Sequence, residues 1–259
     1  MKDSDLIFGL MASINKSEYS VSDLKWLTKP FNISESSLRT SLSRITSKGT
    51  VESHKKGRNA FYKFSSKGKR ISSNVSFSFK EPDWNNWDGS WMGVLFSVPV
   101  IDNSLRYHIR KKLTVYRFAP LYPGVWIRPH NKNEELENNL KDIITNRHCI
   151  TVRFQSLSDI SRKEVIRLWK LNDVNKSLGL GLKILDDKNR NLVSLSPENA
   201  FVDQMLTGGK IVNLLFKDPL LPWEFLPENW NGKHLRDKFS KWIKAVADIS
   251  KPYWGKIFE

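Results

Sequence analysis

Basic side chains gather in one stretch of the sequence, residues 39–70, where they could bind phosphate. The stretch holds ten lysines and arginines and a single acid, Glu52. Lysine binds a phosphate as a point charge and arginine as a bidentate donor, so a local excess of this kind is typical of a nucleic-acid surface. An ordinary solvated basic face is the alternative. The secondary structure that carries these charges distinguishes a nucleic-acid surface from a solvated basic face.

Residues that could perform covalent or metal chemistry are few. The single cysteine, Cys149, follows His148, but neighbours on a strand point to opposite faces and cannot form a catalytic pair. Asp102 lies just beyond Pro99 at the end of a predicted strand. It could be a metal-binding carboxylate, but we favour the N-cap of the next helix. The five histidines lack metal-ligand spacing, and no G-x-S-x-G or H-E-x-x-H motif is present. We therefore expect no enzyme activity, metal or cofactor.

Three short helices are predicted ahead of the basic stretch and within it. The first carries an apolar stripe at i, i+4 and i+8. The second begins at a cap, Ser20 or Ser22, and ends at Pro30. The third begins at Ser34 and stops at Gly49. Residues 50–64 then read as two strands around a basic hairpin tip. The inward-facing residues of the three helices are Leu6, Leu10, Ile14, Leu24, Trp26, Leu27, Leu38, Leu42 and Ile45.

The face of the third helix opposite its apolar stripe carries small hydroxyl groups and arginines. Such a surface allows close approach to a DNA groove, and arginine can reach phosphates or guanine edges. A polar helix followed directly by a basic hairpin is the order of a winged helix-turn-helix, which we assign to residues 1–80. We expect DNA contacts from Ser36, Ser37, Arg39, Thr40, Ser43 and Arg44 of the helix and from Lys55, Lys56 and Arg58 of the hairpin.

The rest of the chain predicts a linker and two further domains, in an α+β protein. Residues 81–90 are polar and turn-rich, which is typical of a linker. Residues 91–160 show the order β-α-β-β-α-β of a ferredoxin-like domain, and residues 161–259 form a helical C-terminal domain. The predicted central elements are strands 91–98, 118–128 and 150–157, the second broken at Pro123-Gly124, and helices 103–117 and 134–145. The predicted C-terminal helices are 163–185, 199–216 and 233–249.

Four stretches resemble the PaaX family, the repressors of phenylacetic-acid catabolism and their relatives. They read LRTSLSRITSKG, WDGSWMGVLFSVP, APLYPGVWIRP and DPLLPWEFLPENWNG, and they occur in the family's order along nearly the whole chain. The resemblance implies a GntR-like winged helix, a central ferredoxin-like domain and a helical C-terminal domain. It also implies DNA-binding dimers, usually repressors released by an aryl-CoA thioester. The chain departs from the family at FVDQMLTGGKIVN, residues 201–213, and at Val100, where the family usually has an acid.

Charge and tryptophan content suggest the class of effector. The chain has a formal net charge of +15, of which residues 1–80 carry +9 (15 basic minus 6 acidic residues) and the remainder carries +6. The remainder also holds nine of the ten tryptophans, which suits an anionic ligand with a flat apolar group. Trp126 and Arg128 share one face of an extended segment and could bind an acyl-CoA, although ordinary packing is the favoured alternative.

Taken together, these features predict a cytoplasmic transcriptional regulator, a repressor, that acts as a homodimer on a palindromic site in double-stranded DNA. Its effector would be a small molecule, with a CoA thioester as the candidate, and no membrane segment is expected. Two alternatives come from other classes. One is a metal-dependent nuclease of the CRISPR-associated ferredoxin-like type. The other is a nucleic-acid-binding protein without sequence preference.

Overall fold

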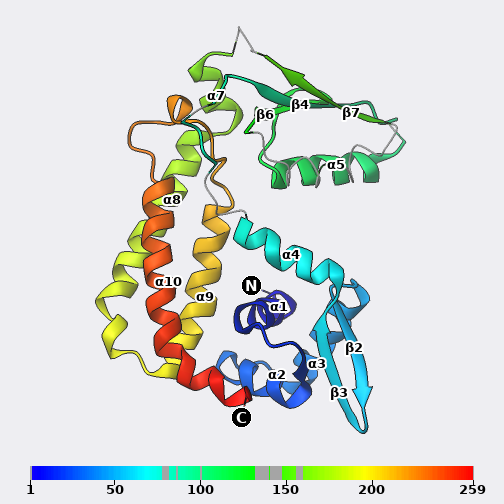
Figure 1. The fold of residues 1–259 in the computed structure, drawn as a ribbon, viewed down its shortest axis with the longest axis vertical. Coiled ribbons are helices and arrows are strands. Elements are labelled where there is room, and N and C mark those ends of the chain that lie inside the picture. The colour runs from blue at the N-terminus through cyan, green and yellow to red at the C-terminus, as the bar shows by residue number, and fades with distance from the viewer. Residues whose placement is uncertain are drawn as a thin grey trace. The chain divides into compact units, whose positions relative to one another are not determined.

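Figure 1 shows the computed structural model, which describes residues 2–77, 82–85, 87–99, 101–131, 140, 148–155 and 160–258. The chain divides into two compact units. The first comprises residues 1–80, 180–215 and 234–259, and the second comprises residues 81–179 and 216–233. The chain is therefore mixed α and β, with two small antiparallel sheets among the described residues. The expected division into domains 1–80, 91–160 and 161–259 stays a prediction.

The first unit begins with three helices and a small sheet. They are α1 (Asp3–Ile14), β1 (Tyr19–Ser20), α2 (Val21–Thr28), α3 (Glu35–Ser47), β2 (Val51–Lys56), β3 (Asn59–Phe64) and α4 (Ser66–Phe77). The strand order is β1-β3-β2, and both pairings are antiparallel. The three helices and the hairpin confirm the expected elements. Strand β1 and helix α4 were not expected, because two residues give no periodicity and residues 66–77 alternate polar and small side chains.

The rest of this unit consists of residues 180–215 and 234–259, which belong to three longer helices. These are α8 (Leu171–Arg190), α9 (Pro197–Leu215) and α10 (Gly232–Trp254), the last followed by a 3-10 turn, η4 (Gly255–Phe258). A Cβ built at Gly181 of α8 would lie about 3 Å from Leu235 of α10 and Leu214 of α9, so the three helices are in close contact. Figure 1 shows α8, α9 and α10 running side by side.

One apolar core joins distant parts of the sequence within this unit. Phe201 of α9 and Tyr253 of α10 are buried in the same cluster as Leu24 and Leu27 of α2. The Tyr253 ring stacks on Trp26, with ring centroids 5.4 Å apart, and lies 5.3 Å from the Phe201 ring. Burial of large side chains in one shared cluster makes the stability of the first three helices depend on the C-terminal third.

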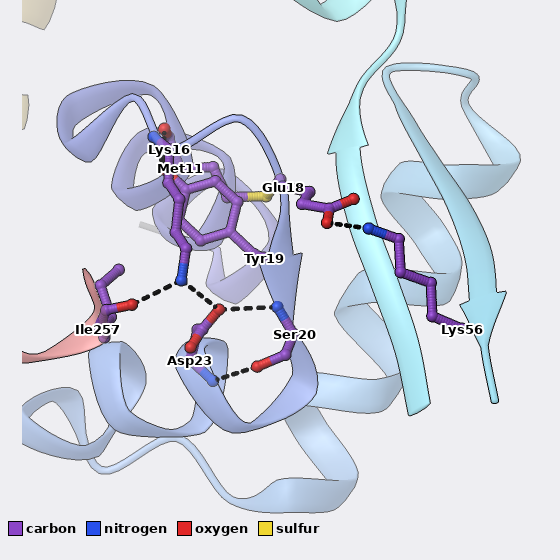
Figure 2. Close-up of polar contacts among 8 residues, drawn as sticks. All are labelled: Met11, Lys16, Glu18, Tyr19, Ser20, Asp23, Lys56 and Ile257. Atoms are coloured by element: carbon purple, nitrogen blue, oxygen red, sulfur yellow. Dashed lines mark hydrogen bonds and ion pairs between the residues drawn. The ribbon is translucent and has the colours of Figure 1, made fainter. Parts of the chain in front are cut away.

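Polar contacts reinforce the same junction (Figure 2). Lys16 Nζ donates to the Ile257 carbonyl at 2.6 Å and to Asp23 Oδ2 at 3.0 Å. Asp23 completes a capping box with Ser20 at the start of α2, since each accepts the other's backbone N–H. The buried Tyr19 hydroxyl donates to the Met11 carbonyl at 2.8 Å, and burial raises the pKa of Tyr19 to about 12. Lys16 thus joins the cap of α2 to the turn η4.

The second unit is built on a four-stranded antiparallel sheet with strand order β5-β6-β4-β7. Its elements are β4 (Trp91–Phe96), α5 (Asn103–Val115), β5 (Ala119–Tyr122), β6 (Val125–Pro129), β7 (Cys149–Phe154) and α7 (Arg162–Leu168). Helix α5 lies along one face of the sheet, and Ile109 and Leu113 pack there against Val94 and Phe96. The turn between β5 and β6 contains Gly124, whose φ of +78° favours glycine. The helix expected at 134–145 falls outside the described residues except for Leu140, which is helical and buried.

Aromatic residues cover the other side of strand β4. The Trp91 ring lies 5.9 Å from Trp87, 6.3 Å from Trp169 and 5.6 Å from Phe225. Trp84 is buried, and its indole N–H donates to the Leu220 carbonyl at 3.1 Å. The described part of the expected linker 81–90 is therefore packed into the second unit, because its tryptophans bury themselves against the proline-rich segment 218–227.

Two C-terminal helix boundaries differ from the sequence prediction. A single helix was expected over 163–185, but α7 ends at Leu168 and α8 starts at Leu171. Lys170 between them has a left-handed φ of +51°, and the Trp169 indole N–H donates to the Arg117 carbonyl at 3.0 Å. Helix α10 continues past the expected end at 249 and through Pro252 to Trp254. The packing of Tyr253 on Trp26 accounts for this extension.

The shared core gives a stability prediction. Phe201→Ala should lower the free energy of unfolding by about 3–5 kcal/mol, because it leaves a cavity where Phe201, Tyr253 and the leucines of α2 meet. Urea denaturation followed by circular dichroism measures this loss. Val193→Ala, at a 99% exposed position, is the matched control and should change stability little. Equal stability of the two variants would contradict a core shared between α2 and the C-terminal helices.

Candidate nucleic-acid interface

Helix α3 presents the polar face that the sequence predicts. Ser34 caps the helix, since its Oγ accepts the Ser37 backbone N–H at 3.2 Å. Leu38, Leu42 and Ile45 are buried in the first core. The opposite face is solvent-exposed, apart from Ser37, which is half-buried. The exposed residues are Ser36, Arg39, Thr40, Ser43, Arg44 and Ser47.

Several of these side chains already have partners. Ser37 Oγ donates to Asp3 Oδ2 of helix α1 at 2.5 Å, which ties α3 to α1. Thr40 Oγ1 donates to the Ser36 carbonyl at 2.9 Å, one turn earlier. A polar face whose hydroxyls are held by the protein itself is pre-organised, because few rotamers remain to be lost on binding.

Arginines 39 and 44 differ in their surroundings. Arg39 donates to Glu35 Oε1 at 2.7 Å, and Lys25 Nζ lies 2.7 Å from the other Glu35 oxygen. These cations hold the pKa of Glu35 below its usual range, so the carboxylate stays ionised. Arg44 is exposed, and it has no acidic partner within 4.0 Å among the residues that the structure describes. Arg44 is therefore the arginine of this face with an uncommitted charge.

The hairpin of β2 and β3 carries the second group of expected contacts. Lys55, Lys56 and Arg58 are all exposed around Gly57, which has a φ of +61°. Lys56 forms an ion pair with Glu18, the residue before β1 (Figure 2). His54 Nε2 lies 3.2 Å from the same carboxylate. Within the described ranges, Lys55 and Arg58 have no such partner, so their charges face solvent unpaired.

The acids Glu18 and Glu35 were not among the residues that the sequence analysis expected at this surface. Each lies within the basic surface and neutralises part of it through a contact made in three dimensions. Helices α2 and α3 also border a concavity of about 390 Å³ beside this surface, with Lys25, Lys29 and Glu35 among its lining residues. The i, i+4 spacing of Glu35 and Arg39 was visible in the sequence as an ion-pair signal, whereas the contact between Glu18 and Lys56 was not.

The second unit encloses the two residues considered for an effector. Trp126 and Arg128 lie on β6 and are both buried. Arg128 donates to the Tyr116 carbonyl at 2.8 Å, at the C-terminal end of α5, and its guanidinium lies 5.8 Å from the Phe118 ring centroid. Burial, and to a lesser degree the charge of Arg117, lowers the pKa of Arg128 to about 9. At pH 7 it is a buried cation held by backbone oxygens, and its role in effector binding stays a prediction.

The two residues weighed for catalysis have structural contacts. Asp102 caps helix α5, since its Oδ1 accepts the Leu105 backbone N–H at 2.9 Å. Cys149 is buried, and burial raises the pKa of its thiol. Across the described residues no group of three or more His, Cys, Asp or Glu side chains could hold a metal ion. In the same residues, no helix is long and apolar enough to cross a membrane.

Comparison with known proteins gives a consistent result along the chain. Residues 5–68 match the family model of PaaX-like proteins, residues 84–166 match that of the PaaX protein central Cas2-like domain, and residues 169–256 match that of the PaaX-like C-terminal domain. Transcriptional repressor PaaX of Escherichia coli (strain K12) is 27% identical over 253 residues, which cover 93% of this chain and 78% of the repressor.

A solved structure shares the fold. The uncharacterized protein Rv0674 from Mycobacterium tuberculosis superimposes with a TM-score of 0.61, at 23% sequence identity. The match covers 96% of this chain and 97% of that chain. At this identity the likeness concerns the fold alone.

The contact between Glu18 and Lys56 predicts a measurable pKa. The hydrogen bond from Lys56 is the largest cause of the lowered pKa of Glu18, so Lys56→Met should raise this pKa toward its ordinary value. The pKa of Glu18 is lower in the folded protein than in the unfolded chain. Ionised Glu18 therefore stabilises the fold at pH values above its unfolded-state pKa, and this stabilisation is lost as the pH falls through its folded-state pKa. NMR titration of the Glu18 side-chain carboxyl measures the pKa in the parent protein and in the variant.

The control for this titration is Lys63→Met, because Lys63 pairs with a different acid, Glu52, at 3.8 Å on the same hairpin. The pKa of Glu18 should be the same in the control as in the parent protein. A pKa of Glu18 that is unaltered by Lys56→Met would refute the ion pair in solution.

Proposed function

Because the chain belongs to the PaaX family, we propose that it is a DNA-binding transcriptional repressor. The observation that carries the proposal is the exposed polar face of α3 with its uncommitted Arg44, next to a hairpin with unpaired Lys55 and Arg58. The name of the Escherichia coli relative supports regulation by repression. A DNA-binding repressor acts where the chromosome lies, so the cytoplasm is the expected location.

In this proposal the first segment is a winged helix-turn-helix. The order α1-β1-α2-α3-β2-β3, with β1 paired to the hairpin, supports it. Helix α3 is the recognition helix and enters the major groove, where arginine reads guanine O6 and N7. The wing contacts a flanking backbone through Lys55, Lys56 and Arg58. Helix α1 supports the recognition helix from behind through the bond between Asp3 and Ser37.

The central sheet is proposed to be ferredoxin-like and to build a homodimer. Counted along the chain from β4 to β7, its strands lie in the order second-third-first-fourth, with α5 between the first and the second, which is the arrangement of that fold. The family match names a Cas2-like domain. Two recognition helices related by a two-fold axis would read a palindromic operator. Its half-sites would lie about 34 Å apart, or a multiple of that distance, on one face of the duplex.

A small molecule, with a CoA thioester as the candidate, is proposed to release the repressor from DNA. A cation such as Arg128 suits an acidic ligand, and Trp126 two residues away suits a flat apolar group. Because both side chains are buried, a ligand would reach them only if the sheet and α5 separate.

Arg44 provides the direct test of the recognition helix. Arg44→Ala should weaken binding to the specific operator by about 1–3 kcal/mol if the side chain contacts a base edge. Fluorescence anisotropy with a labelled operator, selected from random DNA, measures the loss. Arg190→Ala removes an arginine of similar exposure that pairs with Asp187 on α8, and it should bind as the parent does. If both variants bind equally tightly, α3 is not the recognition helix.

The wing should contribute a salt-dependent term that does not depend on sequence. Replacing Lys55 and Arg58 together by alanine should reduce the slope of log K against log salt by about 0.9 for each phosphate that is no longer neutralised, or about 1.8 in all. Affinity for operator and for random DNA should fall by the same factor. The control replaces Lys241 and Lys244, exposed on α10, by alanine. A slope as steep as the parent's would remove the wing from the interface.

A further inference from the structure

Two exposed lysines from opposite ends of the sequence lie beside one tryptophan of helix α2. Lys29 directly follows α2, and Lys256 lies in the C-terminal turn η4. The Nζ atoms of Lys29 and Lys256 lie 5.9 Å and 5.5 Å from the centroid of the Trp26 ring. The fold, rather than the sequence, therefore brings these two positive charges together.

The Trp26 ring positions the two ammonium groups without neutralising them. A lysine near an aromatic ring is attracted by the ring quadrupole, but it keeps its charge and its three N–H donors. In the part of the chain that the structure describes, no carboxylate pairs with Lys29 or Lys256. Lys16 at the same junction differs, because its Nζ is bonded to Asp23 Oδ2 at 3.0 Å. Two unneutralised cations that share one ring attract an anion to this place.

The ring itself is held in place by the C-terminal segment. Tyr253 is buried and stacks on Trp26 with an interplanar angle of 19°. The Trp26 indole N–H also donates to the Tyr253 carbonyl at 3.4 Å. Because Trp26 and Tyr253 are fixed to each other, the position of η4 and its lysine relative to α2 is set before any ligand binds.

The two lysines continue the basic surface of helix α3. Trp26 and Lys29 line the concavity of about 390 Å³ together with Lys25 and Glu35. Glu35 in turn accepts a bond from Arg39 on the exposed face of α3, at 2.7 Å. Both oxygens of Glu35 are engaged by Lys25 and Arg39, so this acid does not interrupt the row of positive charge. The row thus runs from η4 across α2 to the proposed recognition helix.

The lysine pair and the wing lie on different sides of α3. Figure 1 shows the chain end marked C, then α2, α3 and the hairpin of β2 and β3 following one another across the first unit. A DNA strand that lies along this surface carries one phosphate for every 3.4 Å of helix axis. Backbone that continues past α3 on the side away from the wing therefore meets Lys29 and Lys256.

We propose that Lys29 and Lys256 form a second phosphate-binding site for the DNA backbone, on the side of α3 opposite the wing. The inference rests on the proposed function and extends the DNA interface to the C-terminal turn. A polyanion suits these lysines because they lie in an open, exposed row of cations. Contacts of this kind fix the position of the protein on the duplex and carry no sequence information.

The test removes both charges with a double variant, Lys29→Met and Lys256→Met. Methionine keeps a long side chain beside Trp26 and carries no charge. Fluorescence anisotropy with the labelled operator and with random DNA is measured over a range of salt concentrations. The slope of log K against log salt should fall by about 0.9 for each phosphate that is no longer neutralised, or about 1.8 in all. Affinity for the two DNAs should fall by the same factor.

Two further double variants separate charge from structure. Lys241→Met with Lys244→Met, at exposed positions on α10, is the matched control and should keep the parent's slope. Lys29→Arg with Lys256→Arg should also keep it, because arginine binds phosphate and stacks on aromatic rings. Thermal denaturation should give similar melting temperatures for all of these proteins, since exposed charges contribute little to stability. If the arginine variant binds as weakly as the methionine variant, charge is not the cause and the proposal is wrong.

The measurements distinguish this proposal from the proposed function. A parent slope in the methionine variant, together with weakened operator binding by Arg44→Ala, overturns the second phosphate site alone. A reduced slope in a protein that prefers no DNA sequence supports the site and overturns the repressor function. A parent protein that binds neither DNA overturns both. Inorganic phosphate is titrated as well, and if it binds through the two lysines while the DNA slope is unchanged, the site belongs to a free anion and the proposal fails.

Discussion

The burial of Phe201, Tyr253 and Ile257 against helix α2 is the constraint on which the first unit depends. Three helices and a hairpin of about this size bury only a modest apolar area by themselves. Here the apolar residues of α2 pack against two sets of neighbours. One set is α1 and α3, and the other is the C-terminal helices. The proposed DNA-binding surface is consequently supported by residues that are far away in the sequence, and Lys16 adds a polar bond at the same junction.

Electrostatics divides the basic surface into committed and uncommitted charges. Glu18 and Glu35 engage Lys56, Lys25 and Arg39, whereas Arg44, Lys55 and Arg58 keep their charges toward solvent. Exposed ion pairs of this kind contribute little to stability. These ion pairs do hold long side chains in defined positions. A phosphate that binds one of these cations must first displace the carboxylate with which the cation is paired. The number of basic residues therefore overstates the charge that is immediately available to a polyanion.

Local pattern was enough to predict much of this structure. The stripe of Leu38, Leu42 and Ile45 set the exposed face of α3, and the position of Asp102 after Pro99 set the cap of α5. Contacts between distant segments were not accessible in the same way. No periodicity links Glu18 to Lys56, Trp84 to Leu220, or Phe201 to Phe31. The break at Lys170 was missed because the apolar spacing runs through it, and a left-handed residue there depends on the contact of Trp169 with Arg117.

The separation of 227 residues between Trp26 and Tyr253 has a consequence for synthesis in the cell. Helices α1 to α3 leave the ribosome early, yet the side chains that cover Leu24 and Leu27 are translated much later. Until then an apolar patch stays open on the nascent chain, where chaperones or aggregation can reach it. A chain cut short before Tyr253 would leave α1, α2 and α3 without the C-terminal side chains that share their core.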